Sequence, residues 1–211
     1  MEKAKEAFIV MASRYEKIFE SGFYPARHST GFTEQNLVHS YVNALVNALG
    51  DDAIEWLEFP WKDKKQHIDA IVFSKYNKSI YYIEAKRFRL PKQLTELNHD
   101  IKRVKDFYHH SDFEKTMLEH NILPSNFTNH YIIALADIWT GIKENKWKQT
   151  FPSYWTKNVL PNKFEEYEHL GNLLQNSKHT SIKEFESLQN YKLLIAVESL
   201  CDVLTIPTSK M

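Results

Sequence analysis

The apolar residues of the N-terminal quarter recur at the spacing of two amphipathic helices. The first covers residues 3–20 and ends before Gly22 and Pro25. Thr33 then stands where a helix cap is expected, and a second helix runs to Leu49. The apolar positions of the two helices are Ala7, Phe8, Met11, Tyr15, Ile18, Phe19, Leu37, Val38, Tyr41, Val42, Leu45, Val46 and Leu49.

After Asp52 the pattern changes to short runs rich in Ile, Val and Tyr, which favour strands. Three strands are predicted before a long helix that Pro91 opens, and a buried strand follows that helix. Residues 141–190 are predicted to be mostly irregular or helical. Residues 191–200 fit either a strand or a buried helix. The four predicted strands cover residues 53–59 (ended by Pro60), 68–73, 79–86 and 130–138.

This order of helix, three strands, helix and strand predicts an α/β fold, in which helices flank a central mixed sheet. The chain has 211 residues, 43% of them hydrophobic, which fits a single domain over 1–211. Cys201 is the only cysteine, so neither an internal disulfide nor a thiolate zinc site is expected. No long apolar segment and no secretory N-terminus is visible, so we expect a cytoplasmic protein without a membrane span.

The formal net charge is zero, which counts against a dedicated nucleic-acid binder unless the charge is segregated. It is segregated along the chain: residues 86–105 hold seven basic and two acidic residues, and residues 164–189 are acidic. The basic run is either a phosphate-binding surface or an ordinary solvated helix face.

One acid–x–lysine triplet, Glu84-Ala85-Lys86, stands out from three others that begin at Asp63, Asp100 and Glu144. Asp63 and Glu144 lie in polar, loop-like sequence, and Asp100 lies in a predicted helix, where positions two apart diverge. Only Glu84 and Lys86 end a strongly apolar strand, where the two-residue period places both side chains on one face.

The register of the predicted hairpin places a second acid beside this triplet. A four-residue turn at 75–78 pairs Ser74 with Ser79 and therefore sets Asp69 opposite Glu84. Their Cβ atoms would lie about 4.5–5.5 Å apart, a repulsive arrangement that a divalent cation would relieve. The alternative is that both acids end their strands and face water.

Glu34 is a candidate third carboxylate, because it continues the apolar stripe of its helix towards the core. The alternative is that Glu34, in the first turn after the Thr33 cap, only complements the helix dipole.

Asp69, fourteen intervening residues and then Glu84-Ala85-Lys86, with helices before and after, resemble the PD-(D/E)xK, or restriction-endonuclease-like, superfamily. The resemblance covers roughly residues 33–138 and implies an αβββαβ core, with 139–211 as a C-terminal elaboration. Ile68 stands before Asp69 where the motif has proline, at a position that varies widely in the superfamily.

The resemblance implies a nuclease that hydrolyses DNA phosphodiester bonds in restriction, defence or repair. Asp69, Glu84, the backbone carbonyl of Ala85 and Glu34 would bind Mg²⁺ or Mn²⁺, and Lys86 would act on the attacking water. Contacts to nucleic acid are expected from Arg87, Gln93 and Arg103, for which the alternative is surface polar residues.

Two further expectations and one alternative function remain. The C-terminal part is a candidate for homodimer formation, since double-strand cleavage usually needs two active sites. The ten histidines show no paired ligand spacing such as HExxH, so surface or capping roles are expected for them. The alternative function is a catalytically inactive module of the same fold that binds protein or nucleic acid.

Overall fold

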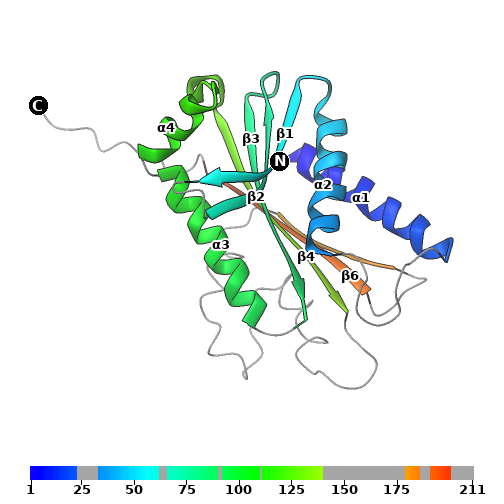
Figure 1. Ribbon diagram of the computed structural model, residues 1–211. Coiled ribbons are helices and arrows are strands. Elements are labelled where there is room, and N and C mark those ends of the chain that lie inside the picture. Colours follow the sequence, from blue (N-terminus) through cyan, green and yellow to red (C-terminus); the bar gives the residue numbers. More distant parts are fainter. Residues whose placement is uncertain are drawn as a thin grey trace, which may run out of the picture.

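The computed structural model describes residues 1–22, 33–61, 66–89, 92–109, 111–139, 179–185 and 191–200. Its described strands form one six-stranded sheet in the order β1-β2-β3-β4-β6-β5 (Figure 1). The strands are β1 (Ala53–Trp61), β2 (Gln66–Ser74), β3 (Ser79–Phe88), β4 (Asn129–Trp139), β5 (His179–Glu184) and β6 (Tyr191–Ser199).

The sheet is mixed. The first three strands form an antiparallel meander, and β4 pairs parallel to β3. A parallel neighbour requires a crossover connection, which runs through α3 (Lys92–His109) and α4 (Ser111–Glu119). A short 3-10 turn, η1 (Pro124–Asn126), precedes β4, and β6 pairs antiparallel with both β4 and β5.

Helices cover both faces of the sheet, and the strand residues alternate between two cores. One core joins α1 (Glu2–Glu20) and α2 (Glu34–Leu49) to strand residues such as Val72, Tyr81 and Ile83. The other joins α3 and α4 to residues such as Ile71 and Tyr82. Figure 1 shows α3 and α4 on the side of the sheet opposite to α1 and α2.

The predicted helices and the early strands are confirmed, with small shifts of their ends. The side chain of Thr33 accepts a hydrogen bond from the backbone N–H of Asn36, so the predicted cap of α2 is present. The predicted hairpin register is confirmed from Ser74↔Ser79 to Ala70↔Ile83.

One strand end was predicted wrongly, and one strand was not predicted. Pro60 does not end β1, which continues to Trp61, because β1 is the edge strand and a missing N–H costs no ladder bond on its open side. The interval 141–190, expected to be mostly irregular or helical, contains strand β5 in its described part. The undecided segment 191–200 forms strand β6 up to Ser199.

Several sequence features lie outside the described residues, among them Cys201, the acids Asp63 and Glu144, and the acidic stretch 164–189 apart from residues 179–185. In the part of the chain that the structure describes, no helix is long and apolar enough to cross a membrane.

Candidate active site

Asp69 and Glu84 continue the β2–β3 register one position beyond the last paired residues, Ala70 and Ile83. Asp69 Oδ2 accepts a hydrogen bond from the backbone N–H of Ala85 at 2.9 Å, which ties the end of β2 to β3. The Glu84 side chain is fully buried, whereas Asp69 is partly exposed. The two carboxyl groups are close enough for their charges to interact. The two acids therefore lie near each other, one position past the end of the paired register.

Both carboxyl groups resist ionisation. Burial raises the pKa of Glu84 well above its usual range, and the negative charges of Asp69 and Asp100 add to this effect against the opposing Arg103. Burial also raises the pKa of Asp69, although the Ala85 N–H and the Lys86 charge oppose the shift. The folded protein therefore favours the protonated forms of Asp69 and Glu84 more than water does.

One oxygen of the Asp69–Glu84 pair has no hydrogen-bond partner among the described residues. Glu84 Oε1 accepts a hydrogen bond from the Arg103 guanidinium at 3.0 Å. Glu84 Oε2 is buried and accepts no hydrogen bond from any residue that the structure describes. A buried carboxylate oxygen without a partner is costly, and a cation is one group that would satisfy it.

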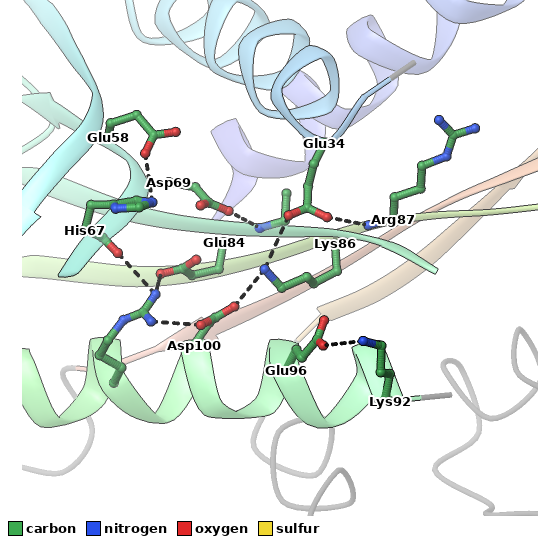
Figure 2. Close-up of polar contacts among 12 residues, drawn as sticks. Glu34, Glu58, His67, Asp69, Glu84, Lys86, Arg87, Lys92, Glu96 and Asp100 are labelled. Carbon is green, nitrogen blue, oxygen red and sulfur yellow. Dashed lines mark hydrogen bonds and ion pairs between the residues drawn. The ribbon is translucent and has the colours of Figure 1, made fainter. Parts of the chain in front are cut away.

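Lys86 lies two positions beyond Glu84 on β3, and its ammonium group is held between two acids (Figure 2). Nζ is 2.9 Å from Asp100 Oδ2 on α3 and 3.3 Å from Glu34 Oε1 on α2. Burial lowers the pKa of Lys86, but the hydrogen bond and charge of Asp100, with Glu34 and Asp69, outweigh it and raise the pKa overall. Lys86 is therefore charged at neutral pH.

Glu34 reaches this group from the first turn of α2, which the Thr33 cap fixes. Its Oε1 contacts Lys86, and its Oε2 accepts a hydrogen bond from the backbone N–H of Arg87 at 3.1 Å. Glu34 is thus both the acid of a first helical turn and a member of the cluster, so the two interpretations of this residue are compatible.

Asp100 and Arg103 of α3 complete the cluster. Arg103 binds Glu84, lies 2.9 Å from Asp100 and donates a hydrogen bond to the carbonyl oxygen of His67. The sequence interpretation set Asp100 aside because its triplet with Lys102 lies in a helix. A different sequence feature indicates that Asp100 and Arg103 lie next to the sheet. They are the neighbours of Ile101 and Val104, which belong to the buried face of α3.

The three residues expected to contact nucleic acid make contacts within the protein. Arg87 is almost buried, and its Nε lies 3.7 Å from Asp137 Oδ2 on β4. Burial raises the Asp137 pKa to about 7, against the opposing charge of Arg87. The side-chain oxygen of Gln93 accepts a hydrogen bond from the backbone N–H of Arg89. Arg103 binds Glu84 and Asp100, so its guanidinium forms part of the acid cluster.

A cavity of about 690 Å³ opens beside these residues. It is lined by the first turns of α2, by Glu58 and Leu57 of β1, and by His67, Asp69 and Lys86. Asp69 and Lys86 therefore face a space that can admit a ligand. The buried Glu84 side chain is not part of the lining.

The oxygen-rich donor set fits a hard divalent cation. Asp69 and Glu84 offer carboxylate oxygens at one place, and Glu84 Oε2 has no other partner among the described residues. Comparison with protein-family models, with curated proteins and with solved structures gives no match. The function must therefore be argued from the geometry of this site.

Proposed function

We propose that this protein is a metal-dependent nuclease of the PD-(D/E)xK class that hydrolyses DNA phosphodiester bonds. The main observation in support is that Glu34, Asp69, Glu84 and Lys86 come together from α2, β2 and β3 beside one cavity. The succession α2-β1-β2-β3-α3-β4 supports a restriction-endonuclease-like core, since β3 and β4 are parallel and joined through α3.

Asp69 and Glu84, with the backbone carbonyl of Ala85, would hold Mg²⁺ or Mn²⁺, and Glu34 would assist as an outer acid. When bound, such an ion polarises a phosphate and lowers the pKa of a coordinated water.

Lys86 acts in this proposal as a hydrogen-bond donor and a fixed positive charge. Its pKa is raised, so at neutral pH it carries no free lone pair and is a poor general base. Its ammonium is positioned by Glu34 and Asp100 and stabilises negative charge that develops on the phosphate. Asp100 and Glu34 are therefore positioning residues for Lys86.

DNA cleavage tests the proposal directly. The purified protein is incubated with supercoiled plasmid and either Mg²⁺ or Mn²⁺, alongside Lys86→Ala and Lys102→Ala. Lys102 is an exposed lysine of α3 and serves as the matched control. We expect cleavage by the wild type and by Lys102→Ala, and a loss of activity in Lys86→Ala. Equal inactivity of wild type and Lys86→Ala on DNA and RNA substrates would refute the enzymatic proposal.

A second candidate is a non-catalytic module of the same fold that binds protein or nucleic acid. The observation in its favour is that Lys86 and Arg103 already neutralise Glu34, Glu84 and Asp100 inside the protein. Calorimetric titration with Mn²⁺ separates the two candidates. No heat of binding in the wild type, with Asp69→Ala unchanged, would favour the module.

Sedimentation at several protein concentrations tests the proposed homodimer, and a strict monomer excludes it.

A further inference from the structure

A second group of ligand-type side chains stands beside the acid pair, on β1 and β2. One ligand atom from each of Glu58, His67 and Asp69 lies within 4.8 Å of the other two. His67 and Asp69 are two positions apart on β2, so they project from the same face of the strand. Glu58 lies between the paired residues Leu57 and Phe59, and thus opposite Asp69. Figure 2 shows Glu58, His67 and Asp69 around one point.

The spacing of these atoms suits a single ion. Ligand atoms about 2.0–2.2 Å from a shared ion are separated by at most about 4.4 Å, so an adjustment of about 0.4 Å suffices. Glu58 and His67 are already in contact, with Oε2 and Nε2 2.8 Å apart, and both side chains are about half exposed. An ion could replace this contact at little cost, because exposed ion pairs contribute little stability.

The positions of the three residues are fixed by the fold. Glu58 has a φ of 52°, in the left-handed region that a glutamate rarely adopts. The backbone carbonyl of His67 accepts a hydrogen bond from Arg103 at 3.1 Å, which anchors this part of β2 to α3. The Ala85 N–H fixes the Asp69 carboxylate.

Asp69 also connects this group to the acid pair. Glu84 is fully buried, its charge interacts with that of Asp69, and its Oε2 has no hydrogen-bond partner among the described residues. Glu58, Asp69 and Glu84 occupy successive strands at matching register positions. Three residues with carboxyl groups therefore follow one another across β1, β2 and β3, and the His67 imidazole lies beside Glu58.

We propose that Glu58, His67 and Asp69 bind a divalent transition-metal ion, at a position distinct from the Asp69–Glu84 pair but sharing Asp69 with it. One imidazole nitrogen and two carboxylates suit Mn²⁺, Co²⁺ or Zn²⁺, whereas Mg²⁺ prefers oxygen ligands alone. Three protein ligands leave coordination positions open towards the 690 Å³ cavity, where water or a ligand oxygen can enter. Binding of a metal ion at this site does not depend on the proposed nuclease activity.

Titration of the metal-free full-length protein with Co²⁺ tests the site, because Co²⁺ bound to a histidine has a visible absorption spectrum that reports its ligands. Zn²⁺ is then added in competition, and Mg²⁺ is titrated separately by calorimetry. The variants are His67→Ala and Glu58→Gln. His39→Ala is the matched control, because His39 lines the same cavity from α2 but does not belong to the group.

We expect Co²⁺ and Zn²⁺ affinity to fall at least about tenfold in His67→Ala and Glu58→Gln, since even indirect ligand support is worth about 10–100-fold. His39→Ala should retain wild-type affinity, and Mg²⁺ binding should be unchanged in all three variants. Equal Co²⁺ affinity and spectra in wild type and His67→Ala would overturn the proposal. Should His67→Ala fail to fold by circular dichroism, Glu58→Gln decides by the same criterion.

The outcomes are separable from those of the proposed function. Co²⁺ binding that depends on His67, in a protein inert towards DNA, would refute the nuclease and leave this site in place. DNA cleavage supported by Mg²⁺, without Co²⁺ binding that depends on His67, would refute this site and leave the nuclease in place.

Discussion

Replacing Glu84 with glutamine should stabilise the metal-free protein at pH 8 while destroying its proposed activity. The Glu84 side chain is 1% exposed, so its negative charge has almost no contact with water. Arg103 attracts that charge, but Asp69 and Asp100 repel it, and the net effect of burial and neighbours raises the Glu84 pKa. The folded state therefore disfavours the charged form.

Glutamine meets the same neighbours without the charge. Its carbonyl oxygen can accept from Arg103, and its amide N–H is a donor for the neighbouring Asp69 carboxylate. Neutral replacements of buried ionic groups often stabilise proteins by about 1–4 kcal/mol. For a domain of this size each kcal/mol raises Tm by about 2–4 °C.

The stabilisation should depend on pH with a definite sign. Below the usual glutamate pKa of 4.5, folded and unfolded Glu84 are both protonated, and the two proteins should be similarly stable. As the pH rises above it, the unfolded chain ionises first, so the wild type loses stability relative to Glu84→Gln. The difference should grow until the pH passes the raised pKa of folded Glu84.

Thermal unfolding followed by circular dichroism at pH 5 and pH 8, in EDTA, measures this difference. Glu96→Gln, at an exposed position of α3, is the control and should show no such gap. Added Mn²⁺ should raise the Tm of the wild type and not that of Glu84→Gln. A Glu84→Gln protein less stable than wild type at pH 8, or a gap that ignores pH, would refute the reasoning.

Three further predictions follow from other contacts. Lys86→Met should lower the initial rate of DNA cleavage at saturating Mg²⁺ at least about a hundredfold, as loss of a charge-stabilising donor does; a rate within a few-fold of wild type contradicts its role. Thr33→Ala removes the α2 cap and should lower the unfolding free energy by about 1 kcal/mol in urea titrations; an unchanged midpoint argues against the cap. Asp137 has a raised pKa of about 7, so wild type should lose more stability between pH 4 and 7 than Asp137→Asn does; parallel urea midpoints of the two proteins at pH 5 and 8 would contradict this.

The structure of the first 90 residues depends mainly on local sequence. The apolar faces of α1 and α2 and the Thr33 cap of α2 depend on neighbouring residues, and the hairpin register depends on one four-residue turn. That is why the position of Asp69 beside Glu84 could be predicted. The same rules did not find β5, an edge strand that exists through its pairing with β6.

The residues that surround Lys86 and Glu84 were harder to predict. Glu34 and Lys86 are 52 positions apart, and their contact depends on how α2 crosses the end of β3. Arg103 was expected to contact nucleic acid, and in the structure its guanidinium binds Glu84. A charged side chain on a helix can reach several partners, and only the packing of α3 on the sheet selects one.

The sequence by itself determined α1, α2, the first three strands and the hairpin register of β2 and β3, because each follows from periodicity and short-range turn geometry. Tertiary structure alone decided which charges neutralise which, that Glu58 and His67 stand beside Asp69, and that Glu84 keeps an unsatisfied oxygen. Those features depend on burial and on distances between side chains of separate elements. A linear pattern of residue types does not contain either quantity.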